Sequence, residues 1–369
     1  MMTSPIQSNP LRILSHALPS PSADGHIFPD IIAAIHESTP VSPTIWINVF
    51  HAVPGRFNLA DLPTSPPSTP GPAVGGEDYF TQKVFDSAVP ITDYQGDLST
   101  LPRSPRPAVP PSSINVSIVE RYVPPTSTNE FQTMFESSGP SILVDRLIEL
   151  SPNNGTLIFI YPTRAGAATF TQEYLAPILD PLLRSISVIN GLSADLAMSL
   201  GRMSAAPSLP TFETMRRRLT TLCSELSNPQ STPANSHTHR FLHSSNNSSS
   251  STYTLAHASP ALVPLSRHVW AKDWWTKQEK PRVRDAITRS AREAAARRCG
   301  GVGGGSGAGA NNGVGAVEAP AELVQQLLEG VCRRGYPRGS FGGDGGCGEL
   351  EREEESGGVE VGVFVVVRG

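Results

Sequence analysis

The spacing of apolar residues between Pro140 and Gly191 changes twice and predicts three consecutive elements. Apolar residues recur every three or four positions over Ile142–Leu150, which indicates an amphipathic helix. A continuous apolar run follows at Thr156–Tyr161, and helical spacing returns from Tyr174 to Ile186. A short strand that is apolar on both faces is typical of a parallel sheet covered by helices on both sides. This segment therefore predicts an α/β fold.

The N-terminal half repeats this alternation of strands and helices. Leu11–Leu18 and Thr44–Phe50 are predicted strands, separated by a helix that carries the apolar residues of Ile27–Ile35. A strand, a helix and a second strand of this length form a right-handed crossover in a parallel sheet. A short helix is expected over Asp78–Val89, and a third strand over Ile114–Tyr122.

The C-terminal half contains more helices and ends in an apolar strand. Apolar periodicity predicts helices over Phe212–Leu226, Asp273–Arg298 and Ala319–Arg334, and a short strand over Tyr253–Ala258. Val359–Val367 is rich in valine and is apolar on both faces towards its end. Such a strand would promote aggregation at an exposed edge, so we expect it to be inserted into the sheet.

Two prolines interrupt the helical pattern that follows Tyr161. Pro177 and Pro181 each lack the amide hydrogen that a helix interior uses, at a cost of about 3 kcal/mol. We therefore expect a break or kink, with one proline opening a new helix at its first position.

Proline and glycine are abundant and unevenly placed, with 35 Pro and 32 Gly among 369 residues. We expect a single α/β domain over residues 1–369 with long disordered insertions. The segments that we expect to be flexible loops or linkers are 63–76, 102–111, 228–252, 300–315 and 335–357.

Charge and cysteine usage narrow the function classes. A net charge of -4 argues against general affinity for nucleic acid, which requires a basic surface. The 4 cysteines form no C-x-x-C pair, so no metal or redox site is expected. Neither a leader nor an apolar stretch long enough to span a membrane is evident. We expect an intracellular protein, cytoplasmic or nuclear, that binds a small molecule or a protein partner.

The order of the predicted elements resembles the class I S-adenosylmethionine-dependent methyltransferase fold, which is Rossmann-like. The helix, turn and strand over Leu150–Phe159 are similar to the region around that family's fifth strand. Val359–Val367 resembles the antiparallel strand with which the family ends. Val123-Pro124-Pro125-Thr126 is similar to a Pro-Pro motif of some members, without its flanking residues. The resemblance implies a mostly parallel sheet, flanking helices and S-adenosylmethionine as cofactor.

The cofactor motifs of that family are degenerate or absent here. The family has a glycine-rich turn after its first strand, whereas Pro19–Gly25 contains one glycine and two prolines. The family places a carboxylate after its second strand, where this chain has His51. On the resemblance, the residues next to the cofactor would be Ser15, Asp24, Gly25 and His51.

Polar residues follow two of the predicted parallel strands. Glu120 and Tyr122 close one strand, and Tyr161, Thr163 and Arg164 close the next. Ligands of open α/β sheets bind beyond these carboxyl ends, although strand ends also become polar where they meet solvent. As catalytic candidates, Glu120 or Tyr161 would position a methyl acceptor, since methyl transfer runs mainly by orientation.

A tryptophan-rich segment supports a different class of function. Trp270, Trp274 and Trp275 would line a ligand cleft, anchor a partner, or pack their indoles against the sheet. The sequence thus leaves two hypotheses open. One is a methyltransferase-like protein of unknown substrate that need not bind the cofactor. The other is a non-enzymatic Rossmann-like scaffold or interaction protein.

Overall fold

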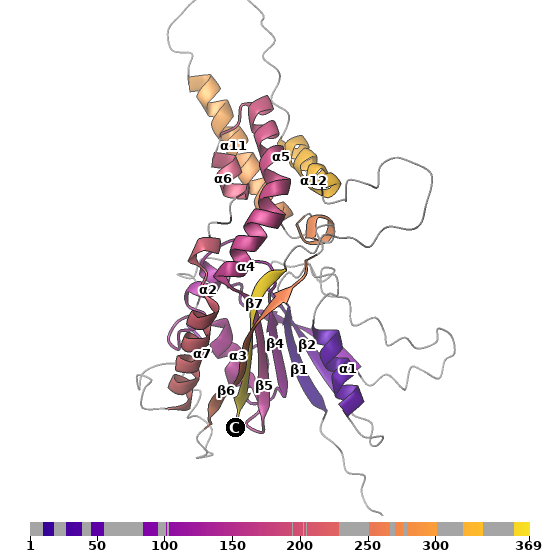
Figure 1. The fold of residues 1–369 in the computed structure, drawn as a ribbon, viewed down its shortest axis with the longest axis vertical. Coiled ribbons are helices and arrows are strands. Elements are labelled where there is room, and N and C mark those ends of the chain that lie inside the picture. Colours follow the sequence, from indigo (N-terminus) through magenta and orange to yellow (C-terminus); the bar gives the residue numbers. More distant parts are fainter. Residues whose placement is uncertain are drawn as a thin grey trace, which may run out of the picture.

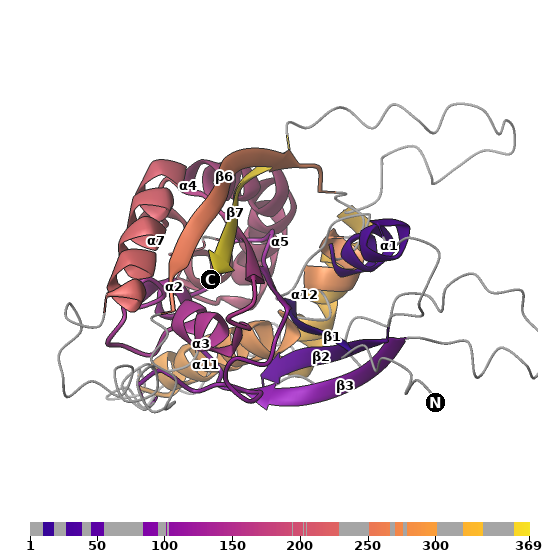
Figure 2. The same ribbon diagram turned by 90° about the horizontal axis from the view of Figure 1, so that it is seen from below.

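The strands among the described residues form one seven-stranded sheet, in the order β3-β2-β1-β4-β5-β7-β6 (Figures 1 and 2). The computed structural model describes residues 10–17, 27–38, 46–54, 84–94, 101, 103–193, 195–201, 203, 205–228, 251–265, 270–275, 279–300, 320–334 and 358–369. The strands are β1 (Leu11–Ala17), β2 (Ile47–Pro54), β3 (Val84–Ile91), β4 (Val116–Glu120), β5 (Gly155–Pro162), β6 (Tyr253–Val263) and β7 (Val359–Arg368).

Strands β1 to β5 pair in parallel, and β7 lies antiparallel between β5 and β6. The expected Rossmann-like α/β fold is confirmed, including the inserted antiparallel strand at the C-terminus. Phe364 of β7 stacks on Phe159 of β5, with ring centroids 5.8 Å apart. The last strand is therefore held by hydrogen bonds on both sides and by aromatic packing across the pair with β5.

Helices cover both faces of the sheet. Figure 2 shows α1 (Phe28–Ser38) on one side, and α3 (Ile142–Glu149) and α7 (Phe212–Ser227) on the other. Phe28 and Ile32 of α1 pack on Ile13 and Ile118, which defines the α1 face. Leu14, one residue after Ile13, belongs to the larger core on the α3 face, because successive side chains of a strand alternate between its faces.

A group of helices lies beyond the carboxyl ends of the parallel strands (Figure 1). The first of them leave β5 as α4 (Arg164–Thr169), the π-helix η4 (Phe170–Leu175) and α5 (Ala176–Asn190). They are joined by α6 (Asp195–Gly201), the π-helix η6 (Trp270–Trp275), α11 (Lys280–Gly300) and α12 (Pro320–Arg334). The short helices α2 (Asn129–Gln132) and η5 (Ala206–Ser208) complete the described elements.

The expected helix over Asp78–Val89 is wrong where the structure describes it, because Val84–Ile91 is strand β3. Residues 78–83 lie outside the described residues. β3 is an edge strand with an exposed Phe85, and Pro90 sits near its end. Proline is tolerated at such an edge. A strand that is partly exposed and contains proline shows little alternation of apolar and polar residues, so its sequence did not indicate a strand.

The chain stays helical from Arg164 to Asn190, so no break separates α4, η4 and α5. The expectation that a proline takes the first position of a new helix is wrong, because Pro177 is the second residue of α5 and Pro181 lies inside it. The helix after β5 changes to π geometry over Phe170–Leu175, and α5 then begins with Pro177 in its first turn. The long helix expected over Asp273–Arg298 is divided, since η6 ends at Trp275 and α11 begins at Lys280.

Helix α4 packs directly on β7 through a glycine. A Cβ atom added to Gly166 would lie 2.0 Å from the carbonyl oxygen of Glu360, so no other residue fits without a shift of the backbone. Thr163 caps this helix by accepting a hydrogen bond from the Gly166 amide at 3.1 Å. These contacts fix the point at which the helices beyond the sheet begin.

Candidate functional site

Three candidate residues lie together at the ends of adjacent strands. Ser15 of β1 is in register with His51 of β2, and Ala17 is in register with Glu120 of β4. Residues in register, or two positions apart on one strand, share a face of the sheet. Ser15, His51 and Glu120 therefore all lie on the α1 face, with exposures of 2%, 5% and 0%.

Glu120 lies at the start of α1. Its Oε2 atom accepts hydrogen bonds from the Ile27 amide at 3.0 Å and from the Tyr122 hydroxyl at 3.0 Å. Ile27 directly precedes α1, and its carbonyl accepts the Ile31 amide of the first turn. A carboxylate at this position satisfies an amide that the helix leaves unpaired and lies at the positive end of the helix dipole. Burial and the charge of Glu120 raise the pKa of the Tyr122 hydroxyl far above its usual value.

The structure places His51 against α1 as well. The centroid of its ring is 5.6 Å from that of Phe28, with the two planes nearly perpendicular. Its side chain is thus held between β2 and the first residue of the helix. Two further cofactor candidates, Asp24 and Gly25, lie outside the described residues.

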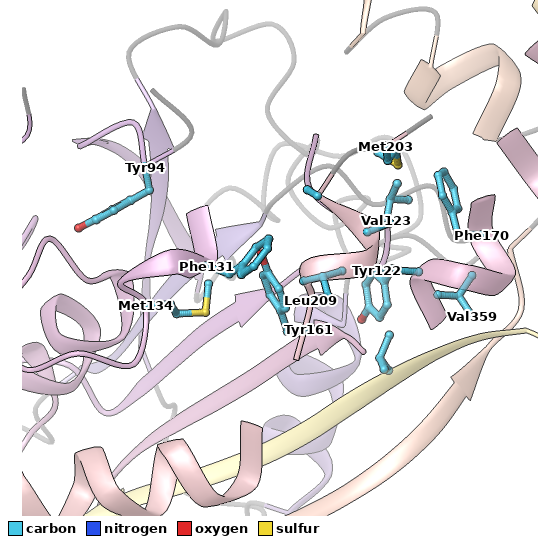
Figure 3. Close-up of a cluster of buried hydrophobic side chains, with 14 of the residues drawn as sticks. Tyr94, Tyr122, Val123, Phe131, Met134, Tyr161, Phe170, Met203, Leu209 and Val359 are labelled. Carbon is cyan, nitrogen blue, oxygen red and sulfur yellow. The ribbon is translucent and has the colours of Figure 1, made fainter. Parts of the chain in front are cut away.

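Tyr161 lies on the opposite face of the sheet from Glu120. Ile160 is in register with Glu120, so the next side chain, Tyr161, points to the α3 face. Its hydroxyl donates to Glu130 at 2.8 Å. Figure 3 shows Tyr161 with Phe131 and Met134 in a cluster of buried side chains. The structure therefore does not bring the two catalytic candidates together.

Glu130 is also paired with Arg121. The Nε and Nη2 atoms of Arg121 donate to the two carboxylate oxygens of Glu130 at 2.7 and 2.5 Å, and Nη1 donates to the Val123 carbonyl at 3.1 Å. Both charged residues are 2% exposed. Burial is the main cause that raises the pKa of the Tyr161 hydroxyl, and the Glu130 charge adds to it. This network ties α2 to the ends of β4 and β5.

The sequence reasoning missed a second buried group of charges, on α3. Asp145 accepts hydrogen bonds from the Tyr94 hydroxyl and from the Arg106 amide, the latter at 2.6 Å. Glu149 accepts from Arg146 at 2.9 Å and from the Ala108 amide at 2.5 Å. Burial raises the pKa of Glu149 to about 7. The sequence contained a sign of this group, because Asp145, Arg146 and Glu149 lie within a helix that was predicted to pack in the core.

His16, next to Ser15 on β1, faces this second group. It is 1% exposed, and its Nδ1 atom has no hydrogen-bond partner among the described residues. Burial lowers its pKa well below the usual range, and the charges of Arg146 and Arg121 lower it further. The imidazole is therefore neutral, which avoids a further buried positive charge beside Arg121 and Arg146.

The strand-end residues of β5 stabilise the start of α4. The Thr163 hydroxyl bonds to Glu360 as well as to the Gly166 amide, and Arg164 Nε donates to the Leu209 carbonyl at 2.8 Å. These bonds anchor the first helix beyond the sheet to β7 and to the segment before α7. The structure thus gives Thr163 and Arg164 a role in packing.

Trp270 and Trp275 of η6 are core residues. Trp270 and Trp275 are fully buried, and Trp270 packs edge-on against Phe170 of η4, with centroids 5.6 Å apart. The packing interpretation is confirmed, although the neighbour of Trp270 is a helix and not the sheet. Trp270 and Trp275 are therefore not exposed to a partner.

A metal-binding group of side chains and a helix able to span a membrane are both absent from the part of the chain that the structure describes. It contains no group of three or more His, Cys, Asp or Glu side chains arranged to hold a metal ion. None of its helices combines the length and the apolar character that a membrane crossing requires.

The described strand ends fit S-adenosylmethionine poorly. A helix that follows the first strand of such a sheet offers its N-terminus to an anionic ligand group, but here Glu120 is bonded to the amide that precedes α1. The end of β2 presents a buried imidazole, His51, and not the carboxylate that would bind ribose hydroxyls. We therefore assign no chemical step to this cofactor.

No family model matches the sequence, and no curated protein matches it. Solved structures do match, among them one described as loganic acid methyltransferase with SAH. It is 12% identical, the match covers 97% of this chain and 84% of that chain, and the TM-score is 0.42. The fold assignment therefore rests on the strand order and pairing of the sheet.

Proposed function

We propose that this protein is a methyltransferase-like Rossmann-fold protein that holds a small ligand where β1, β2 and β4 end. The supporting observation is the place of Ser15, His51 and Glu120 at the topological switch point. From β1 the chain proceeds to β2 on one side and later to β4 on the other. Ligands of open α/β sheets bind at the crevice outside such a reversal.

The polar groups at this point suit orientation of a small polar molecule. Ser15 brings a hydroxyl, His51 an imidazole and Tyr122 a phenol, and all three are nearly buried. Groups held this firmly position a reactant without moving themselves, which is the main contribution of an enzyme to methyl transfer. Glu120 is the acidic group at this place, whereas Tyr161 belongs to the network on the other face.

S-adenosylmethionine is the cofactor implied by the fold resemblance, and we propose that it binds weakly. We expect a dissociation constant no tighter than about 100 μM, which corresponds to roughly -5.5 kcal/mol. The physical reasons are the carboxylate at the start of α1 and the lack of one at the end of β2.

Isothermal titration calorimetry of the purified full-length chain tests this proposal. The titrants are S-adenosylmethionine and the uncharged nucleoside adenosine. Weak binding of the first, with saturable binding of the second that Ser15→Val weakens at least tenfold, is the expected result. The exposed substitution Arg216→Ala on α7 serves as a control and should change neither affinity. Low-micromolar binding of S-adenosylmethionine would overturn the weak-binding proposal, and no binding of either would overturn the site.

A further inference from the structure

The proposed ligand site at Ser15, His51 and Glu120, called the switch-point site below, contains one buried carboxylate, that of Glu120. The inference about the ligand charge that this site accepts rests on the proposed function. This carboxylate is 0% exposed, and its Oε2 accepts the Ile27 amide at the start of α1. The N-terminus of a helix is where an incoming phosphate or carboxylate would bind, since amide donors and the helix dipole both favour an anion there. In this chain the anion is supplied by the protein itself.

The arrangement is fixed from two sides. The Tyr122 hydroxyl donates to the same Oε2 atom, and the register of β1 with β4 sets Glu120 beside Ala17. A carboxylate with two hydrogen bonds on one oxygen, inside a fully buried site, does not swing aside at low cost. A ligand in this site therefore meets the negative charge of Glu120.

Among the remaining groups, Ser15 and His51 bring no negative charge, whereas the exposed Asp30 in the first turn of α1 brings one that helps to raise the pKa of Tyr122. Ser15 and His51 stand beside Phe28 on the α1 face, so the set offers hydrogen-bonding groups and an aromatic edge. Such a set suits a neutral molecule that has both polar and apolar parts. A ligand carboxylate would be repelled strongly by Glu120, because the effective dielectric constant inside a buried site is low.

We infer that the site selects against ligands that carry a carboxylate and takes uncharged ligands instead. Two probes differ in this respect. S-adenosylhomocysteine bears a carboxylate and an ammonium group on its thioether side chain, whereas 5′-methylthioadenosine keeps the nucleoside and the sulfur but carries neither. The wild-type protein is expected to bind 5′-methylthioadenosine at least about tenfold more tightly, since a tenfold ratio corresponds to only 1.4 kcal/mol.

The ammonium group of S-adenosylhomocysteine provides the competing explanation. If Glu120 paired with it, the acid would be a binding residue and its removal would weaken binding. Glu120→Gln separates the two cases, because it removes the charge while keeping an oxygen that can accept the Ile27 amide. Our inference requires the variant to bind S-adenosylhomocysteine at least tenfold more tightly than wild type, and 5′-methylthioadenosine within about threefold.

The experiment is a calorimetric cycle of both probes against wild type and Glu120→Gln, with thermal melting to verify that the variant is folded. Glu213→Gln, an exposed glutamate of α7, makes the same charge change away from the site and should alter neither affinity. Weaker binding of S-adenosylhomocysteine by Glu120→Gln, or equal affinities of wild type for both probes, would overturn the inference. Binding of neither probe would overturn the proposed function and the inference together.

A third probe tests the inference without any substitution, in case Glu120→Gln does not fold. The 5′-(3-aminopropyl)thio derivative of adenosine keeps the ammonium group of S-adenosylhomocysteine and lacks only its carboxylate. Wild type is expected to bind it at least tenfold more tightly than S-adenosylhomocysteine. Equal affinities would show that the carboxylate is tolerated, which contradicts the inference.

Discussion

Replacing Glu130 with alanine should destabilise the folded protein severely. The substitution removes both charge-assisted hydrogen bonds between Arg121 and Glu130, at 2.7 and 2.5 Å, and the acceptor of the Tyr161 hydroxyl at 2.8 Å. Arg121 is 2% exposed, so its guanidinium would remain away from water. Only its bond to the Val123 carbonyl is left among the contacts described above.

The magnitude follows from these losses. Removing one partner of a buried ion pair costs about 3–5 kcal/mol. An unsatisfied buried hydroxyl adds about 1–3 kcal/mol, but the terms share one acceptor and do not add fully. We expect a loss of about 4 kcal/mol, a large fraction of the 5–15 kcal/mol by which domains are usually stable.

Urea denaturation followed by far-ultraviolet circular dichroism measures this loss. Tyr161→Phe, which removes only one hydrogen bond to Glu130, should cost about 1 kcal/mol. The double variant Arg121→Met, Glu130→Leu leaves no charge unpaired and should recover at least half of the loss. A loss below about 1 kcal/mol for Glu130→Ala would show that the network is solvated, and Tyr161 would again be an accessible catalytic candidate.

Two further predictions concern α3 and β7. Burial raises the pKa of Glu149 from 4.5 to about 7, so the folded chain holds this proton more tightly than the unfolded chain. The stabilisation from this bound proton is fully present below about pH 4.5 and is lost as the pH rises through 7. The effect on the free energy of unfolding is of order 1–3 kcal/mol. In wild type the free energy of unfolding, measured with urea, should fall between pH 5 and 8, and Glu149→Gln should reduce that fall. An equal fall in the variant would contradict the raised pKa of Glu149. Deleting Val359–Gly369 removes a strand that pairs with both β5 and β6. The truncated chain should be insoluble on expression, and a soluble product with an unchanged cooperative melt would refute the structural role of β7.

The sequence predicted the strand-end cluster because parallel strands end at one edge of a sheet. Glu120 ends β4, whereas Ser15 and His51 lie two and three residues before the ends of β1 and β2, and the register of the strands places all three on one face. The face on which each side chain lies depends on register, and a shift of one residue reverses it. Tyr161 follows the partner of Glu120 by one residue, so it points to the other face.

Long-range partners were beyond sequence reasoning. Arg121 and Glu130 are nine positions apart, in a segment whose turn and short helix α2 have little periodic signal. The bonds from Arg106 and Ala108 to α3 likewise come from a proline-rich segment for which no single conformation was expected. In both cases the partner is brought close by irregular backbone, which apolar spacing does not encode.

The place of β7 in the sheet has a consequence for biosynthesis. β7 is translated after the other six described strands, yet it lies between β5 and β6, which are made much earlier. Roughly 95 residues separate Val263 from Val359, so at about 5–20 residues per second the ribosome needs about 5–20 s to supply the missing strand. During that interval β5 and β6 both lack β7, the strand that lies between them in the finished sheet. Each therefore presents an unpaired strand edge, the kind of surface that leads to aggregation and that chaperones protect.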